Sequence, residues 1–316
     1  MDQKTFLRLG GTLTSGCRLR PISMIFLTAF WALMTGTLLG APENPGQQYR
    51  IPGPDTTQII TLDDGSSLVG RITEVGDNDI KIATSMGEMT IAKAKIREVK
   101  EVPVSSMKGG QYWFPNPNRT RLYLGPTGRM LKKGEGYFTD FYVFFPGVAF
   151  GVTDNITLGG GVSLIPGLDV DHQLFYFTPK VGFKPSENLD LAASLIMVRV
   201  PGGDLDVDKP KFVGVLFGTG TIGNDANSLT FGVGFGYADT ELADKPAVNL
   251  GGELRIARRL SLVSENWVFP EVDNPLISYG VRFFGENLAV DLALFNVLGE
   301  DAIFPGVPFI DFVWNF

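Results

Sequence analysis

The stretch Leu229-Thr-Phe-Gly-Val-Gly-Phe-Gly-Tyr237 decides the fold, because its residues separate into two unlike faces. Leu, Phe, Val, Phe and Tyr occupy the odd positions, whereas Thr and three glycines occupy the even ones. A period of two residues is that of a β-strand, whose successive side chains point to opposite sides. Leu288-Ala-Val-Asp-Leu-Ala-Leu294 repeats the pattern, with Asp291 on the face away from its leucines. We therefore expect strands that are apolar on one face and small or polar on the other.

Similar segments fill the chain from Arg119 to its last residue, and we count twelve. Two of them are irregular: one has Pro146 in mid-run, which predicts a bulge or bend, and Leu260–Phe269 alternates poorly around Glu265. The segments are Arg119–Pro126, Tyr137–Val152, Ile156–Ile165, Gln173–Lys184, Leu189–Val200, Lys211–Ile222, Leu229–Ala238, Ala247–Ile256, Leu260–Phe269, Leu276–Phe284, Leu288–Leu298 and Val307–Phe316.

The connections between these segments alternate in length. Longer links separate five tight turns, at Thr153-Asp-Asn155, Ser186-Glu-Asn188, Asn224-Asp-Ala-Asn227, Ala257-Arg-Arg259 and Gly285-Glu-Asn287. Short turns on one rim and long loops on the other are typical of bacterial outer-membrane barrels, with the short turns in the periplasm. Counting back from Phe316 places both ends of the predicted barrel on the short-turn side.

Strand parity places charged side chains on the face opposite to the leucines and phenylalanines. A soluble β-sandwich would bury one of these faces, and unpaired buried charges cost several kcal/mol each. Lipid is the solvent that permits apolar residues outside and charges inside. We therefore predict an all-β fold, an antiparallel up-and-down transmembrane β-barrel of about 12 strands, with inward charges at Asp140, Lys180, Lys184, Glu253, Arg255, Glu265, Arg282, Asp291 and Asp311.

The inward charges leave two interpretations open. They could form a selectivity ring, or they could pair with one another, which their nearly balanced signs favour. Twelve strands enclose more space than eight, whose side chains fill the interior, and far less than a 16-strand porin. We therefore expect a narrow or occluded lumen.

The amino end predicts a secretory signal peptide over residues 1–40. Basic residues precede the uncharged apolar run 22–39, and small residues follow at Gly40 and Ala41. The alternative is an uncleaved membrane anchor. The single cysteine, Cys17, precedes the apolar run, which argues against lipidation. The mature chain would then have no cysteine for disulfides, thiolate catalysis or metal binding.

Between the signal and the barrel we expect a linker at 41–56, a small periplasmic β module at 57–104 and a second linker at 105–118. Five short strands with tight turns resemble an SH3-like or Sm-like barrel. The alternative is a strand-rich extension without a binding role. The module's predicted strands are Gln58–Leu62, Ser67–Ile72, Asp79–Ala83, Met89–Ile91 and Ile96–Val102.

The last strand carries a candidate assembly signal. Phe312, Trp314 and Phe316 lie on one aromatic face and end the chain. This resembles the C-terminal signal that outer-membrane barrels present to the barrel assembly machinery. The expected partners are that machinery, outer-membrane lipid and lipopolysaccharide, and an unknown periplasmic partner. Nucleic acid is not expected, because the net charge is −7 and no basic patch exists.

Three motifs might carry chemistry, and for each we favour a plain structural interpretation. Gly218-Thr-Gly-Thr-Ile-Gly223 matches a dinucleotide fingerprint but is followed by another strand instead of a helix. Asp204-Leu-Asp-Val-Asp208 opens like a calcium loop but lacks its glycine and its final glutamate, so a solvated acidic loop is favoured. The single histidine, His172, is the only base available to a lipid-cleaving rim enzyme, and no facing serine is identifiable. We expect no catalytic, cofactor or metal site, although acidic loops could bind divalent ions that bridge to lipopolysaccharide.

The turn and strand Gly151-Val-Thr-Asp-Asn-Ile-Thr-Leu-Gly-Gly-Gly161, its echoes at Ser186-Glu-Asn-Leu189 and Gly285-Glu-Asn-Leu288, and Phe316 resemble a family of uncharacterised outer-membrane β-barrel proteins of Gram-negative bacteria. The resemblance covers residues 119–316 and implies a porin-like barrel in the outer membrane, without an activity to transfer. We expect a narrow channel or a structural role. The alternatives are a rim enzyme acting on lipid, and a binding protein that docks a periplasmic partner through the small module.

Overall fold

The computed structural model describes residues 49–201, 211–239, 241–270, 272, 274–299 and 303–316. The predicted signal peptide with Cys17, most of the first linker and the acidic loop Asp204–Asp208 lie outside the described residues. The chain divides into two compact units, Met1–Val104 and Ser105–Phe316.

The first unit is a five-stranded antiparallel sheet in the order β4-β3-β2-β1-β5. Its core is built from isoleucines: Ile60, Ile80 and Ile82 are fully buried, and Ile72, Ile91 and Ile96 join them. Five strands were predicted near these positions, and the likeness to SH3-like or Sm-like barrels stays a prediction. The elements are β1 (Thr56–Leu62), β2 (Ser67–Val75), β3 (Asp79–Thr84), β4 (Gly87–Ala92), the 3-10 turn η1 (Lys93–Lys95) and β5 (Ile96–Pro103).

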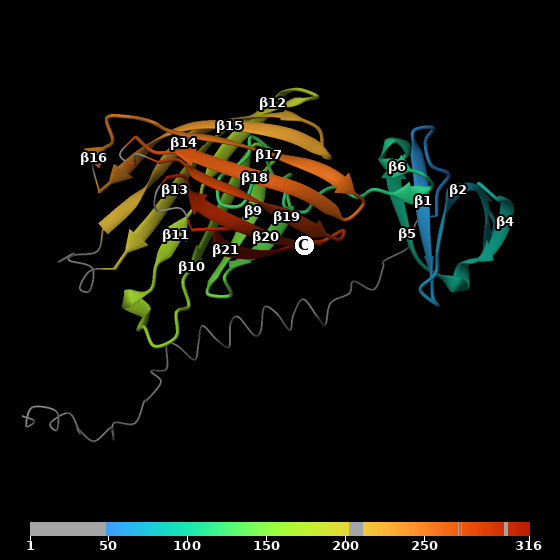
Figure 1. Ribbon diagram of the computed structural model, residues 1–316. Helices are drawn as coiled ribbons and strands as arrows, with labels where there is room; N and C mark the ends of the chain where they lie inside the picture. Colours follow the sequence, from blue (N-terminus) through green and yellow to red (C-terminus); the bar gives the residue numbers. More distant parts are fainter. Residues whose placement is uncertain (1–48, 202–210, 240, 271, 273, 300–302) are drawn as a thin grey trace, which may run out of the picture. The chain divides into compact units, whose positions relative to one another are not determined.

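The second unit is a closed antiparallel β-barrel (Figure 1). After the 3-10 turn η2 (Val104–Ser106) and the hairpin β6 (Met107–Lys108) and β7 (Gln111–Tyr112), its wall begins at Gly136. The wall comprises β8 (Gly136–Phe141), β9 (Phe145–Thr153), β10 (Ile156–Val162), β11 (Phe175–Phe177), β12 (Lys180–Ser186), β13 (Leu189–Val200), β14 (Lys211–Gly223), β15 (Asn227–Ala238), β17 (Ala247–Ala257), β18 (Leu260–Val268), β19 (Leu276–Phe284), β20 (Leu288–Val297) and β21 (Val307–Asn315). The 3-10 turn η3 (Val170–His172) and the short β16 (Glu241–Leu242) lie outside it.

The wall has twelve positions, because β11 and β12 share the place between β10 and β13. Pairing of β21 with β8 and of β9 with β10 closes the ring. The predicted antiparallel up-and-down barrel of twelve strands is therefore confirmed.

Two of the predicted segments were wrong, and the two errors left the predicted number of strands at twelve. Tyr137–Val152 is not one bent strand but two, β8 and β9, joined by a turn in which Tyr142 and Val143 have positive φ. Arg119–Pro126 is not a wall strand, since it forms only an isolated bridge between Arg121 and Pro126. Thr120 on one of its faces and Arg121 on the other are polar and buried, so neither face is suited to contact lipid.

The alternation of connections is observed as predicted. Short turns at 154–155, 187–188, 224–226, 258–259 and 285–287 lie on one rim, together with the start of β8 and the end of β21. The last residues of β10, β13, β15, β18 and β20 lie at the other, which we call the long-loop rim. The turn at 142–144 is the one short connection on that rim.

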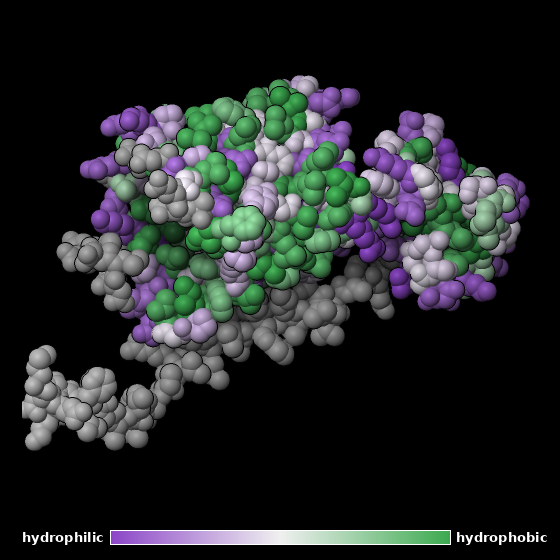
Figure 2. Space-filling view, viewed as in Figure 1, coloured by the Kyte–Doolittle hydropathy of each residue, from purple (hydrophilic) through white to green (hydrophobic). Residues whose placement is uncertain are grey.

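The outer face of the wall is apolar. Large apolar side chains are exposed on nearly every wall strand, among them Phe150, Leu158, Phe183, Leu216, Phe231, Leu254, Leu262, Phe283 and Leu292. Figure 2 shows broad apolar patches on the visible face of the barrel. The inner face instead carries buried threonines, serines and charged residues. In the part of the chain that the structure describes, no helix is long and apolar enough to cross a membrane.

Candidate functional site

The barrel interior is the candidate site, because a segment of the chain's own sequence occupies part of it. We call residues 113–135 the lumen segment. It begins at the short-turn rim, where Phe114 packs against Phe284, Ala289 and Val313. It turns back near Tyr123, which contacts Phe295 and Phe309 toward the other rim. It returns to Gly136, where β8 starts, so it enters and leaves the lumen at one end.

Arg282 is the centre of the contacts between the wall and the lumen segment. Its Nε and Nη2 donate to both carboxylate oxygens of Asp291, at 2.6 and 2.8 Å. Nη1 reaches Glu253 at 3.1 Å and the carbonyl of Asn118 at 2.8 Å, and Nη2 also reaches the carbonyl of Leu122 at 2.6 Å. The side chain is fully buried. One guanidinium therefore joins three wall strands to two points of the lumen segment.

The lumen segment also supplies a cation, Arg121, which pairs with the wall. Its Nη2 donates to Asp311 and to the Thr139 hydroxyl, both at 2.6 Å. The Arg121 guanidinium also lies over the ring of Phe141, with its carbon 4.6 Å from the ring centroid. A bidentate or multiply bonded arginine fixes geometry better than a lysine would. The buried charges are thus paired across the boundary between segment and wall.

Two asparagines of the lumen segment complete this network. Asn118 Nδ2 donates to Asp291 at 3.0 Å, and Asn116 Nδ2 donates to Glu253 at 2.7 Å. Each amide therefore meets a carboxylate that Arg282 also holds.

Glu265 holds the tip of the lumen segment. Its carboxylate accepts three successive backbone N–H groups, from Tyr123 at 2.7 Å, Leu124 at 3.0 Å and Gly125 at 2.9 Å. The indole of Trp267 donates to the same carboxylate at 2.6 Å. These amides belong to a tight turn in which Leu122 N donates to Gly125 O. A fully buried carboxylate is stable here because four donors replace its water.

The opposite wall contacts the returning half of the lumen segment. Lys180 Nζ donates to the carbonyls of Thr120 and Arg129, at 3.0 and 2.5 Å. Gly128 N donates to the hydroxyl of Thr221 at 2.8 Å. A side chain at Gly128 would collide with the backbone of Asp190, so only glycine permits this close approach. The lumen segment therefore contacts strands on all sides of the barrel.

Six of the nine predicted inward charges are buried against the lumen segment or its partners: Lys180, Glu253, Glu265, Arg282, Asp291 and Asp311. Arg255 also faces inward, at the short-turn rim, where it donates to Phe114 O and lies 4.9 Å from the centroid of Trp113.

Asp140 does not belong to this set. It is paired with Phe312 and Pro146, on the outward face, and its carboxylate accepts the N–H of Phe145. The prediction assumed that every strand charge must point inward, but Asp140 lies one residue from the strand end, at the rim. Lys184 is also exposed, beyond a register shift in β12.

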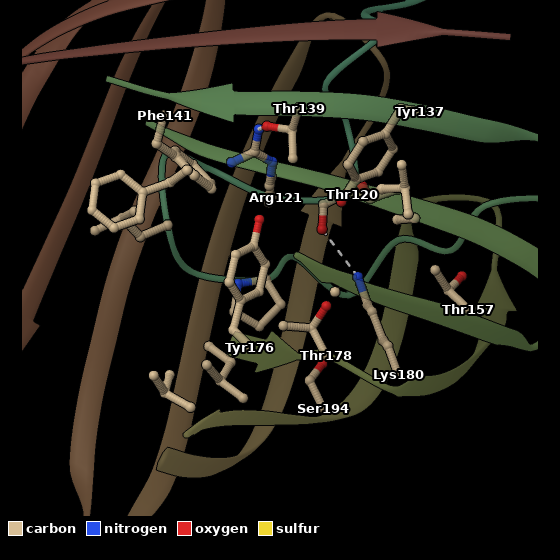
Figure 3. Close-up of a pocket in the computed structure, with 18 of the residues that line it drawn as sticks. Thr120, Arg121, Tyr137, Thr139, Phe141, Thr157, Tyr176, Thr178, Lys180 and Ser194 are labelled. Atoms are coloured by element: carbon tan, nitrogen blue, oxygen red, sulfur yellow. Dashed lines mark hydrogen bonds between the residues drawn. The ribbon is translucent and has the colours of Figure 1, made fainter. Parts of the chain in front are cut away.

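A cavity of about 590 Å³ lies beside the lumen segment, toward the long-loop rim (Figure 3). Its floor is formed by the lumen segment at Thr120, Arg121, Leu124 and Pro126. Strands β8 to β13 and the ends of β20 and β21 form its walls, which are mostly apolar. The lumen is therefore divided between a hydrogen-bonded segment and an open space.

Sequence reasoning missed the lumen segment, which it assigned partly to a linker at 105–118 and partly to a strand. Two signals pointed to it. The predicted inner face carried buried charges without identified partners, and Arg119–Pro126 carries two arginines on one of its faces. Pro115, Pro117 and Pro126 also disfavour a regular strand. What no sequence pattern indicates is the pairing of Asn116 with Glu253, 137 residues away.

The three predicted motifs lie apart from this network. Gly218–Gly223 lies within β14 and is paired on both sides, with a short turn and another strand after it. His172 is in η3 with its side chain 38% exposed, and its Nδ1 lies 3.7 Å from an oxygen of Asp171. Asp169 completes an exposed cluster with these two residues.

Phe312, Trp314 and Phe316 alternate with buried residues of β21 and face outward. Trp314 and Phe316 contact each other, with ring centroids 6.0 Å apart.

No known protein family and no curated protein matches this sequence. Among solved structures, the chain is similar to the KdgM porin, with 7% identity and a TM-score of 0.39, over 58% of this chain and 96% of that one. It is also similar to outer-membrane expressed OmpT of Vibrio cholerae, with 13% identity and a TM-score of 0.32, over 83% and 95%. OccK11 (OpdR) of Pseudomonas aeruginosa matches with 11% identity and a TM-score of 0.31, over 83% and 94%. These similarities are too low to carry an argument about function.

Proposed function

We propose that this chain is an integral outer-membrane β-barrel whose lumen segment keeps a narrow channel closed. The observation that carries the proposal is the inverted burial. Phe231 and Leu254 are about half exposed, at 53% and 51%, while Arg282, Glu265 and Asp311 are fully buried. Apolar residues around the whole outside of a closed barrel require a lipid solvent.

The orientation follows from the connections. Short turns face the periplasm in outer-membrane barrels. The lumen segment enters from the short-turn rim, so the chain before it, including the five-stranded module, would be periplasmic and available to a partner there. The predicted signal peptide is the expected export route, and the outward aromatic residues of β21, ending in Phe316, support recognition by the barrel assembly machinery. The acidic long loops would face lipopolysaccharide.

The channel is proposed to be closed because the lumen segment is bonded on all sides. Its contacts include the Arg282 network, the Glu265 carboxylate and the carbonyls held by Lys180. The proposal assigns no catalytic reaction.

Membrane insertion is tested by gel migration. The full-length protein from outer-membrane fractions should migrate as a compact band in SDS without boiling and as a slower band after boiling. A protein that dissolves in buffer without detergent would overturn the proposal.

Closure is tested by conductance in planar bilayers. The wild type should be nearly silent, and replacing residues 116–128 with Gly and Ser over the same length should produce open channels. Replacing residues 164–168 in the same way, in a long loop, should leave the protein silent. Large conductance in the wild type would contradict closure, and silence of both variants would point to a structural role instead.

A further inference from the structure

The cavity beside the lumen segment contains polar atoms that have no partner. Among the described residues, Arg121 Nε, Thr157 Oγ1, Tyr176 Oη and Ser194 Oγ are buried without a hydrogen bond, and all four belong to residues that line this cavity. Buried polar groups in proteins are normally hydrogen-bonded, and each exception needs an explanation. A ligand or ordered water in the cavity would supply the missing partners.

Two of these residues, Thr157 and Ser194, form a row across adjacent strands together with Lys180. Thr157 on β10 is directly opposite Lys180 on β12, and Lys180 is directly opposite Ser194 on β13. Directly opposed residues in antiparallel strands have Cβ atoms about 4.5–5.5 Å apart. Figure 3 shows these side chains on one side of the cavity, with Lys180 directed to Thr120 of the lumen segment. The row therefore places one lysine between two residues that carry hydroxyl groups.

Lys180 is a buried cation without an anion. Its two acceptors are neutral carbonyls, and within the described part of the chain no carboxylate lies within salt-bridge distance of Nζ. The ammonium has three donors, so one remains. Arg282 and Arg121, by contrast, are each paired with an aspartate. An uncompensated buried charge is costly, and an anionic ligand would compensate it.

Between the polar row and the long-loop rim, the cavity is lined by apolar side chains. Along β13, Ile196 and Val198 follow Ser194 toward the long-loop rim, and Leu174, Phe295 and Phe309 lie at that same end. Tyr176 fits there because it lies against Gly147 and Gly161, where any side chain would collide with its hydroxyl. The cavity is thus polar beside Thr157, Lys180 and Ser194 and apolar toward the long-loop rim. Its volume is within the range of about 300–1,000 Å³ that is typical of small-molecule pockets.

We propose that this cavity binds a single-chain amphiphile of the long-chain carboxylic acid type, with its anionic head on the row Thr157, Lys180 and Ser194 and its apolar chain toward the long-loop rim. A carboxylate accepts hydrogen bonds from the ammonium and from both hydroxyls. That the ligand enters from outside the cell rests on the proposed function. The binding itself requires only a folded barrel.

Binding is tested with the full-length protein in a neutral detergent, with dansyl-undecanoic acid as the fluorescent probe. The probe should bind saturably at one site, and dodecanoic acid should displace it about tenfold more effectively than dodecan-1-ol, because only the acid pairs with Lys180. Equal displacement by acid and alcohol would overturn the assignment of the head group.

Variants locate the site. Ser194→Leu fills the cavity from the wall and should weaken probe binding by about tenfold or more. Ala193→Leu, on the outward face of the same strand, should leave it unchanged. Lys180→Met should remove the preference for acid over alcohol, whereas Lys184→Met, exposed on the same strand, should keep it.

The outcomes separate this proposal from the channel proposal. Probe binding that Ser194→Leu does not weaken would place the probe on the outside of the barrel and overturn the site. Heat-modifiable migration of each variant shows whether it has folded. If Lys180→Met does not fold, two measurements still test the proposal. These are probe binding by Ser194→Leu and the displacement of the probe from the wild type by dodecanoic acid and by dodecan-1-ol. A silent, heat-modifiable barrel that binds no probe would refute the ligand and leave the closed barrel standing.

Discussion

The five-stranded module and the barrel are built from the same kind of strand but distribute their residues in opposite ways. In the module, Ile60, Ile80 and Ile82 are fully buried and ion pairs such as Lys81 with Glu74 lie on the surface. In the barrel, Arg282 and Asp291 are buried, whereas Phe231 and Phe283 are exposed. The module therefore has the distribution of a protein in water, and the barrel has its inverse.

The difference teaches that alternation alone does not say which face is the interior. Both units have strands with a period of two. In the module the charged side chains are solvated by water. In the barrel they are hydrogen-bonded by the lumen segment, which supplies amides, carbonyls and a second arginine. A closed wall can thus bury charge wherever another part of the chain pairs with it.

The largest expected effect comes from removing the centre of the barrel network. Arg282→Met leaves Asp291, Glu253 and two carbonyls of the lumen segment without their shared donor. Breaking a buried ion pair in this way costs about 3–5 kcal/mol. Urea unfolding in lipid vesicles should show this loss, and Arg259→Met, an exposed arginine of a short turn, should show almost none. Equal stability of the two variants would mean that the buried charges do not hold the barrel.

The next prediction compares the two exteriors directly. Phe231 lies near the middle of β15 on the outward face, and Met86 is exposed on the module. Phe231→Arg should destabilise the barrel by about 2–4 kcal/mol if that face is in lipid. Met86→Arg should change stability by less than about 0.5 kcal/mol. Folding yields and unfolding in vesicles measure both. A harmless arginine at 231 would show that the barrel exterior is not in lipid.

A smaller effect is expected at the tip of the lumen segment. Glu265→Gln replaces an acceptor-only carboxylate with an amide that also presents donors to Tyr123, Leu124 and Gly125. Hydrogen bonds to charged groups contribute about 1.5–3 kcal/mol, so a loss of about 2 kcal/mol is reasonable. Amide hydrogen exchange at 123–125 should accelerate about 30-fold. Glu187→Gln, exposed at a short turn, is the control, and unchanged exchange at the tip would remove Glu265 from this role.

The smallest effect is expected at the module surface. Hydrogen bonding and attraction from Arg50 lower the pKa of Glu101 below its ordinary value. A lowered folded-state pKa means that this stabilisation is present above the unfolded-state pKa, near 4.3, and is lost as the pH falls through the folded value. Isoleucine methyl signals of the module core, followed in urea at pH 6 and pH 3, measure it. Glu101→Gln should reduce the difference, and an unchanged difference would show that other carboxylates cause it.

Much of the barrel was predictable from local pattern. The period of two, the tight turns with Asp and Asn, and the unequal connections are properties of neighbouring residues, and they identified ten of the strands and the two rims. Errors arose where local pattern is ambiguous. The turn at 142–144 contains Tyr142 and Val143 at positive φ, which aromatic and β-branched residues rarely adopt, so the sequence showed no break there.

The candidate site was only half predictable. Parity identified Lys180, Glu253, Glu265, Arg282, Asp291 and Asp311, because a charge in the middle of an alternating strand has to face away from lipid. It failed for Asp140, since a charge at a strand end is close to water whichever face it occupies. It could not identify the lumen segment, whose residues have no period.

The sequence by itself determined the character of the wall: that it is an antiparallel barrel, which face of most strands is apolar and which rim holds the short turns. These follow from contacts between residues close along the chain. Only the tertiary structure decided what fills the barrel. Asn116 meets Glu253 and Arg121 meets Asp311 because ring closure places distant strands around one short segment, and no local preference encodes which buried charge meets which partner.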